Sequence, residues 1–289
     1  MEESLEKPKV SIIIPTYNSG KTLAECLKSV HGQSYPFYEV IVVDNFSNDD
    51  TLETANDFGA KIIQRKCIPA LARNMGIANS TGKYILFLDS DQILSPSVVE
   101  ECVKKCENRK VGMVRIPELF IGKGFWSRCS AFWKNYYAKV EQLYGASEKI
   151  IHGEPRFFIK EQVTRVGMLD ATLLWGEDYE LYEKLKKANI KEDSCESKLY
   201  HYELTSVRKI LIKNLRYGKS APIFLQQTKK QIFPLLLRHA LLTFREVFRN
   251  FKRSPAIVVG CGVLLCLKTY FMMMGLLIGY LSRDKGRNC

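Results

Sequence analysis

Apolar and polar positions alternate along the first half of the chain as a regular series of strand-like and helix-like segments. The strand-like segments are short β-branched or apolar runs at 10–14, 39–44, 61–64, 83–88 and 111–116. Segments with apolar residues at helical spacing separate them, at 20–30, 51–58, 70–82 and 95–106. This alternation predicts an α/β fold, with an open, mostly parallel central sheet and helices on both of its faces.

Proline and serine residues indicate where one expected strand ends and one expected helix begins. Pro15 is expected to end the first strand, because proline cannot donate to a strand ladder. Ser95 is expected to cap the fourth helix, with Pro96 in its first turn.

Mostly polar segments lie at the carboxyl ends of three of the expected strands. They are Pro15-Thr16-Tyr17-Asn18, Asp44 and Asp89-Ser90-Asp91. Open parallel sheets bind ligands at the carboxyl ends of their strands, so we expect these segments to share one crevice. Two carboxylates one residue apart suit Mg²⁺ or Mn²⁺, which proteins usually hold with one or two carboxylates plus substrate phosphates. A solvated acidic turn is the alternative.

The second half follows a different pattern. From about 118 to 166 the alternation is lost and aromatic residues become frequent, 175–190 is again helical, and the chain is helical and basic after His201. We therefore expect a domain at 1–205, with halves at about 8–117 and 118–205, and a helical appendage at 206–289.

Charge is distributed unevenly between these parts. The whole chain has 43 Lys and Arg against 31 Asp and Glu, a net charge of +12, whereas residues 206–289 contain 16 basic and 2 acidic residues, a net of +14. The first 205 residues therefore carry −2. This excludes a basic nucleic-acid-binding core and favours an appendage that meets an anionic membrane surface.

The nine cysteines contain no CxxC pair and no Cys/His cluster at zinc spacing. With no apolar leader segment visible, we expect reduced thiols and a cytosolic catalytic portion. Cys102 and Cys106 are expected to pack in the core rather than to carry redox chemistry.

Two features of the appendage indicate membrane association. An apolar stripe at helical spacing runs beside a basic one, as in helices that lie in a headgroup layer: Leu237, Leu241, Phe244, Phe248 and Phe251 beside Arg238, Arg245, Arg249 and Lys252. Packing against the catalytic domain is the alternative. Residues 256–281 are long enough to cross a bilayer, although Lys268 lies near their centre. One span, a re-entrant hairpin bent near Lys268 and two interfacial helices remain open.

Four motifs in this order and at these separations resemble glycosyltransferase family 2, the inverting GT-A class that uses nucleotide-sugar donors. They are VSIIIPTYNSG, VIVVDNFSNDDT, ARNMGIANSTGKYILFLDSDQ and WGEDYELYEKL, and the resemblance extends from Val10 to His201. It implies the GT-A fold, with the nucleotide sugar on the first half of the domain and the acceptor on the second.

The resemblance also implies roles for individual residues. The nucleotide sugar would be bound by Pro15, Thr16, Tyr17, Asn18, Asp44, Arg73, Asn74, Asp89 and Ser90. Among these, Asp44 would accept a hydrogen bond from the base, and Asp89 would lie near the ribose and the metal. Ser19, and Asn45-Phe46-Ser47, depart from the usual motifs and leave the choice between UDP and GDP open.

The chemical step would rest on further acidic residues. The resemblance implies Mg²⁺ or Mn²⁺ bound by Asp89, Asp91 and His201, with Asp91 as the principal ligand, and Asp178 as general base beside Glu177. From the residues alone, His201 is as readily structural, and a favourable helix start is the alternative for Glu177-Asp178. His152 and Arg156 are acceptor-side candidates for binding a phosphate or a sugar hydroxyl.

These observations predict a membrane-associated, metal-dependent glycosyltransferase of the hexosyltransferase type with a cytoplasmic catalytic domain. It would move one sugar from a UDP- or GDP-linked donor to a lipid-linked acceptor, either a polyprenyl phosphate or a lipid-linked glycan. The Gln-x-x-Arg-Trp motif of processive relatives is absent from the sequence. Alternatives are a protein or soluble glycan acceptor, a sugar-phosphate nucleotidyltransferase, and a catalytically silent scaffold.

Overall fold

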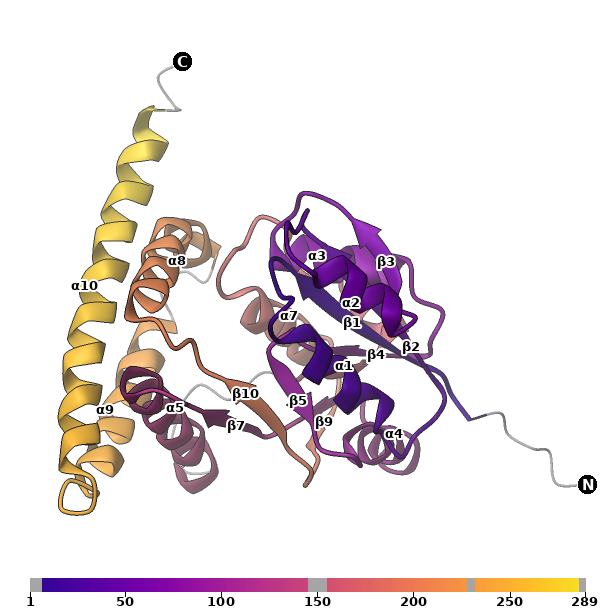
Figure 1. The fold of residues 1–289 in the computed structure, drawn as a ribbon, viewed down its shortest axis with the longest axis horizontal. Coiled ribbons are helices and arrows are strands. Elements are labelled where there is room, and N and C mark those ends of the chain that lie inside the picture. The colour runs from indigo at the N-terminus through magenta and orange to yellow at the C-terminus, as the bar shows by residue number, and fades with distance from the viewer. Residues whose placement is uncertain (1–6, 145–154, 228–231, 286–289) are drawn as a thin grey trace, which may run out of the picture. The chain divides into compact units, whose positions relative to one another are not determined.

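The computed structural model describes residues 7–144, 155–227 and 232–285, arranged in two compact units (Figure 1). The first unit contains residues 1–117, 154–172 and 177–200, and the second contains 118–153, 173–176 and 201–289. The stretch 118–205, expected as one half of a catalytic domain, is thus divided between the two units. His152 lies outside the described residues.

A seven-stranded sheet forms the centre of the first unit, with strand order β3-β2-β1-β4-β8-β6-β9. Its strands are β1 (Val10–Thr16), β2 (Tyr38–Asp44), β3 (Lys61–Gln64), β4 (Tyr84–Phe87), β6 (Met113–Arg115), β8 (Phe157–Ile159) and β9 (Glu192–Ser194). β3, β2, β1 and β4 are parallel, β8 is antiparallel to β4 and β6, and β9 is parallel to β6. The short strand β5 (Gln92–Leu94) follows β4. The expected mostly parallel sheet is confirmed.

Helices cover both faces of this sheet, as predicted. Side chains along a strand point alternately to opposite faces. Ile12 and Ile14 pack in one core with α1 (Leu23–His31), α2 (Thr51–Asp57) and α4 (Val98–Arg109). Ile13 packs in another with α3 (Pro69–Ala78), α6 (Lys160–Arg165) and α7 (Glu177–Lys187). Cys102 and Cys106 belong to the first core, as expected.

Two expected boundaries are wrong. β1 continues through Pro15, which pairs with Val43, and this is tolerated because β4 pairs with β1 only as far as Ile13. α4 begins at Val98 rather than beside Ser95. The Ser95 hydroxyl instead donates to the carbonyl of Lys198, at 2.6 Å.

The second unit contains the helices of the appendage and a helix that the aromatic sequence concealed. That helix is α5 (Phe125–Tyr144), and it follows β7 (Glu118–Ile121). β10 (Leu199–Tyr202) leads the chain into α8 (Val207–Gln227), α9 (Ile232–Phe248) and α10 (Pro255–Lys285). The apolar stripe predicted on 237–251 is exposed, and so are the four basic residues beside it.

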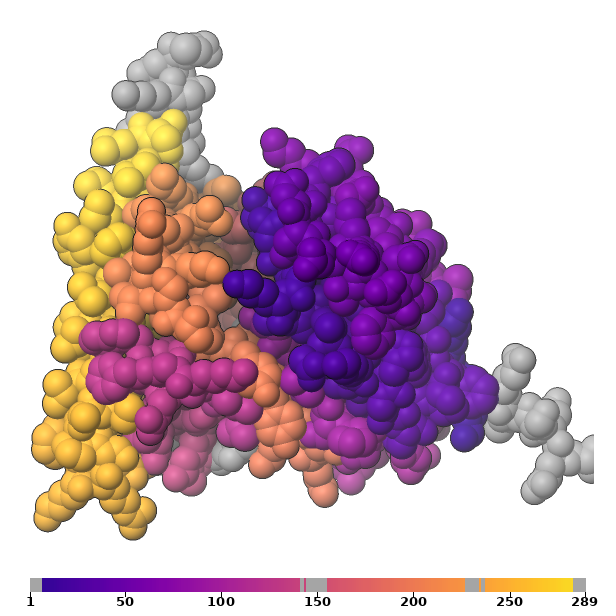
Figure 2. Space-filling view, viewed as in Figure 1, coloured from indigo at the N-terminus to yellow at the C-terminus, as the bar shows by residue number. Residues whose placement is uncertain are grey.

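α10 is one uninterrupted helix of 31 residues, which Figure 2 shows as a continuous strip of surface. Lys268 causes no break in it, so the re-entrant hairpin and the two interfacial helices are wrong. α10 is the one helix in the described part of the chain that is long and apolar enough to cross a membrane, by length and composition.

Glycines bring α10 and α8 into close contact. A Cβ on Gly275 would lie 2.2 Å from the carbonyl oxygen of Leu215, and one on Gly218 would lie 2.1 Å from that of Met272. Backbones approach this closely only where side chains are absent, as in small-xxx-small packing between membrane helices.

Candidate functional site

A buried carboxylate holds the ends of β1 and β2 together in the first unit. Asp44 is fully buried and pairs in register with Thr16. Its Oδ1 accepts hydrogen bonds from the hydroxyls of Thr16 at 2.8 Å and Ser47 at 2.5 Å, and its Oδ2 accepts one from the Ser47 N–H at 2.9 Å. Asp44 therefore stabilises the turn after β2, and a contact with a base stays a prediction.

The loops after β1 and β2 are locked to each other by polar contacts. Asn18, at φ 50°, donates its N–H to the Ser47 hydroxyl at 2.8 Å and accepts the N–H of Asn48 on its side-chain oxygen at 2.9 Å. Ser19 stands where the first motif of the resembled family often has an acidic residue. Its hydroxyl lies 2.8 Å from that of Ser90. The three predicted loops thus form one connected rim at the carboxyl ends of the strands.

Arg73 connects the acidic motifs. Its buried guanidinium on α3 bonds to Asp89 Oδ1 at 2.9 Å, Glu177 Oε1 at 3.1 Å and Asp178 Oδ1 at 3.2 Å. It also lies 5.6 Å from the centroid of the Phe87 ring. Burial alone would lower the pKa of Arg73, but Asp178, Asp89 and Glu177 raise it. We therefore treat Arg73 as a permanent cation that assembles three carboxylates.

The carboxyl groups at the start of α7 differ in environment. Burial, followed by repulsion from Asp178, raises the pKa of Glu177 to about 7 in spite of Arg73. The Asp178 side chain is 37% exposed against 11% for Glu177. Of the two, Asp178 is therefore the carboxylate that can reach an incoming substrate.

Asp89 also contacts a second arginine, Arg156, which lies just before β8. Because β8 is antiparallel to β4, residues just before β8 arrive where β4 ends. Arg156 lies there, with Nη1 3.4 Å from Asp89 Oδ2 and its carbonyl accepting the Phe87 N–H at 2.9 Å. Arg156 was expected on the acceptor side, and the structure places it beside Asp89.

The side chain of Asn74 is engaged with the backbone. It donates to the carbonyl of Leu169 at 2.8 Å and accepts the Leu169 N–H at 3.1 Å. Both ends of the amide are thus used to hold the 169 segment on α3. The predicted contact between Asn74 and a nucleotide stays a prediction.

The acidic residues suit a cation that completes its shell with substrate. Among the described residues, no group of three or more His, Cys, Asp or Glu side chains is arranged to hold a metal ion. Asp89 and Asp91 flank Ser90 and are both half-buried. Two carboxylate side chains fit Mg²⁺ or Mn²⁺ that takes its other ligands from a diphosphate and water.

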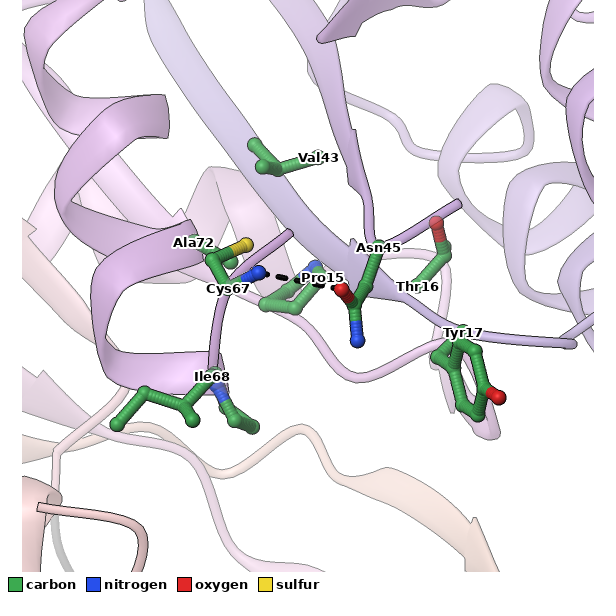
Figure 3. A pocket seen from close by; sticks show the side chains of 9 residues that line it. Pro15, Thr16, Tyr17, Val43, Asn45, Cys67, Ile68 and Ala72 are labelled. Carbon is green, nitrogen blue, oxygen red and sulfur yellow. Dashed lines mark hydrogen bonds between the residues drawn. The ribbon is translucent and has the colours of Figure 1, made fainter. Parts of the chain in front are cut away.

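A small pocket of about 130 Å³ lies beside the first motif (Figure 3). It is lined by Pro15, Thr16, Tyr17, Val43, Asn45, Cys67, Ile68, Pro69 and Ala72. The Asn45 side-chain oxygen accepts the N–H of Cys67 at 3.1 Å, which fixes the orientation of the amide at the pocket wall. Three of the residues predicted for the nucleotide line this pocket; the 67–69 segment was missed, because the helix start at Pro69 was its only sequence signal.

His201 belongs to the second unit. Its Nδ1 lies 3.4 Å from Glu118 Oε2, and its ring lies against Phe120 with centroids 5.3 Å apart. Trp175 and Gly176 also belong to this unit: Gly176 has φ 84°, and a Cβ there would lie 2.4 Å from the Phe224 ring. The Trp-Gly-Glu-Asp motif is therefore shared between the units, and the role of His201 as a metal ligand stays a prediction.

Comparison with known proteins identifies related sequences. The sequence model of glycosyl transferase family 2 matches residues 11–165. An uncharacterized glycosyltransferase of Rickettsia prowazekii is 30% identical over 194 residues, covering 64% of this chain and 60% of that protein. Glycosyltransferase GlyG of Streptococcus pneumoniae is 31% identical over 112 residues, covering 36% and 37%. The chain thus spans three fifths or less of these relatives.

Solved structures share the fold. The mannosyltransferase PcManGT of Pyrobaculum calidifontis, in complex with GDP-Man and Mn²⁺, superposes with a TM-score of 0.60 at 18% identity, covering 96% of this chain and 87% of that one. TarS 1–349 of S. aureus, in complex with UDP-GlcNAc, has a TM-score of 0.55 at 16% identity, covering 96% and 92%. The predicted GT-A fold is confirmed.

Proposed function

Because this chain belongs to glycosyl transferase family 2, we propose that it transfers a single sugar from a nucleotide diphosphate sugar to a lipid-linked acceptor at a membrane surface. One observation carries the proposal. Arg73 joins Asp89, Glu177 and Asp178, which come from distant motifs, at the sheet edge where the loops after β1 and β2 also meet.

The donor end of the site is the pocket beside Pro15 and Asn45. Its mostly apolar walls suit the flat faces of a base, and the Asn45 amide, fixed by Cys67, supplies a donor for a base carbonyl. Uracil and guanine both present such a carbonyl. The complexes of TarS with UDP-GlcNAc and of PcManGT with GDP-Man support a UDP- or GDP-linked donor in the same fold.

A divalent cation would be held by Asp89 and Asp91, with His201 as a further predicted ligand. When bound, Mg²⁺ or Mn²⁺ would neutralise charge on the departing nucleoside diphosphate. Asp89 is engaged by Arg73 and Arg156. We keep Asp91 as the principal ligand, as the resemblance implies. The two arginines add fixed positive charge at the same place, where a diphosphate is favoured.

We assign Asp178 to activate or orient the acceptor. Inversion requires attack from the side opposite the departing diphosphate, and a carboxylate can accept the proton of an attacking hydroxyl. Arg73 Nη1 lies 3.2 Å from the Asp178 carboxylate, which stands in the first turn of α7, where the helix dipole favours negative charge. If the acceptor is itself a phosphate, no proton needs to be removed, and Asp178 orients the attack.

The second unit supports an acceptor carried by a lipid. α10 is apolar over a membrane-spanning length, and the exposed stripe on α9 combines two phenylalanines and two leucines with basic neighbours, continued by exposed Phe251 just after the helix. A helix of this kind lies in the headgroup layer of a membrane with anionic lipids. The catalytic unit would then lie on the cytoplasmic side, where nucleotide sugars are made.

The test is nucleoside diphosphate release from a panel of UDP- and GDP-sugars by detergent-solubilised protein. Reactions would contain Mn²⁺ or EDTA, with and without polyprenyl phosphate, beside the Asp91→Ala variant. We expect release that requires both the metal and the lipid and falls at least about 100-fold in the variant. Release that ignores the lipid would instead assign a soluble or protein acceptor, and no turnover of any donor would refute the proposal.

A further inference from the structure

Asp89 lies between two guanidinium groups within the first unit. Its Oδ1 lies 2.9 Å from Arg73 Nη2, and its Oδ2 lies 3.4 Å from Arg156 Nη1. Each oxygen of the carboxylate therefore faces a cation. A divalent metal ion held by Asp89 and Asp91 would stand beside both arginines, and like charges so close together repel. The arginine that is held less firmly is the one that gives way.

The two arginines are held at Asp89 with unequal strength. Arg73 also bonds to Glu177 at 3.1 Å and to Asp178 at 3.2 Å. The contact of Arg156 with Asp89 is longer than the about 2.7–2.9 Å of a strong charge-assisted hydrogen bond. The side chain of Arg156 is also more exposed, at 15% against 5% for Arg73. Arg156 is therefore the arginine that can leave.

Only the side chain of Arg156 has to move. Its backbone N–H donates to the carbonyl of Val114 at 3.3 Å, and its carbonyl accepts the N–H of Phe87 at 2.9 Å. These bonds fix the backbone between β6 and β4. The guanidinium can therefore change its partner by rotation about the side-chain bonds while the strands stay in place.

A diphosphate is the partner that suits the released guanidinium. A divalent cation at Asp89 and Asp91 takes its remaining ligands from substrate phosphates and water, which brings a diphosphate to the end of β4. The planar guanidinium fork matches phosphate oxygens and can bond to two of them at once. The diphosphate also supplies negative charge that offsets both the cation and Arg156.

We propose that Arg156 exchanges partners when the donor binds. In the free protein it pairs with Asp89. Once Asp89 holds the metal, Arg156 bonds to the diphosphate of the nucleotide sugar. Arg156 is then a donor-binding residue, and its pairing with Asp89 keeps the affinity for the metal low until the nucleotide arrives. This inference rests on the proposed function and assigns a residue to the donor side of the same site.

The test measures binding of Mn²⁺ and of nucleotides to the full-length protein in detergent. Arg156→Met and Arg156→Gln remove the charge, and Arg165→Met, at an exposed arginine that ends α6, is the matched control. We expect the Kd of Mn²⁺ alone, measured from the EPR signal of the free ion, to fall about tenfold in both Arg156 variants. The control should change it by less than about twofold, because an exposed charge is screened.

Nucleotide binding should change in the opposite direction. UDP and GDP are titrated in saturating Mn²⁺, and the nucleotide that the wild type binds more tightly is used for the comparison. Its Kd should rise about tenfold in both Arg156 variants, as for the loss of one charge-assisted contact. A folding defect cannot imitate tighter binding of the metal together with weaker binding of the nucleotide.

Three results would overturn the exchange. A Kd of Mn²⁺ alone that does not fall would exclude competition between Arg156 and the metal. An unchanged Kd of the nucleotide would exclude the contact with the diphosphate. Weaker binding of both in both variants would leave Arg156 only a supporting role for Asp89. If the wild type binds neither UDP nor GDP, the proposed function fails together with this inference, whereas nucleotide binding that is insensitive to Arg156 refutes this inference alone.

Discussion

Replacing Arg73 by methionine tests the central ion cluster most directly. Methionine fills a similar volume but leaves Asp89, Glu177 and Asp178 without their shared cation. Removing one partner of a buried ion pair costs about 3–5 kcal/mol, because the remaining charge is buried and uncompensated. At about 2–4 °C per kcal/mol for a domain of this size, Tm should fall by about 6–20 °C.

The pH dependence of this loss identifies its cause. Without Arg73, the pKa of Glu177 should rise above about 7, so that protonation relieves the repulsion at low pH. The Tm deficit of Arg73→Met should therefore be larger at pH 8 than at pH 5.5, as measured by thermal unfolding in one detergent. Arg109→Met is the matched control, since Arg109 is exposed and pairs with Asp193 at 3.0 Å on the surface, where such pairs contribute about 0–1 kcal/mol. A Tm loss in Arg73→Met no greater than in the control, or equal at both pH values, would refute the reasoning.

Two further predictions concern single positions. The pKa of Glu177 is raised from 4.5 to about 7, so the stability linked to its protonation is present below pH 4.5 and is lost as the pH rises through 7. In the wild type this loss lowers the free energy of unfolding by at most about 3 kcal/mol between pH 5 and pH 8. Glu177→Gln should therefore flatten the accompanying decline of Tm, and an unchanged slope of Tm against pH would contradict this. Gly275→Val should destabilise the α8–α10 pair by about 1–3 kcal/mol in thermal unfolding, because its Cβ would overlap the Leu215 carbonyl. Gly262→Ala is the control: no atom lies within 4 Å of the added carbon, so the change should be neutral or stabilising by up to about 1 kcal/mol. An equal loss of stability in both variants would contradict close packing between α8 and α10.

The sequence was most informative where one local rule decided the structure. The strands of β1 to β4 and the polar residues after them follow from hydrophobic runs and from the binding rule for parallel sheets. Asp89 and Asp178 were expected in one site, and Arg73 does join them. That Arg73 would bind carboxylates was not foreseen, because an arginine on a helix carries no local sign of which anion it meets.

Features that depend on distant pairing were missed. α5 was concealed because adjacent aromatic pairs, Phe125-Trp126, Phe132-Trp133 and Tyr136-Tyr137, occupy its partly buried and exposed positions, which blurs helical periodicity. Arg156 reaches Asp89 only because β8 runs antiparallel between β4 and β6, and strand direction cannot be inferred from a three-residue strand. The break of the chain into two units at Pro117 likewise follows from packing rather than composition.

The three ion pairs of the Arg73 guanidinium couple ligand binding at Asp89 to the start of α7. One guanidinium holds α3, the end of β4 and the first turn of α7, so a cation or diphosphate that draws Asp89 away changes the energy with which α7 is held. Such coupling is reciprocal: whatever fixes Glu177 and Asp178 more firmly must alter the affinity of Asp89 for its ligand by the same factor. The proposed donor and acceptor sides of this site would thereby be linked through a single side chain.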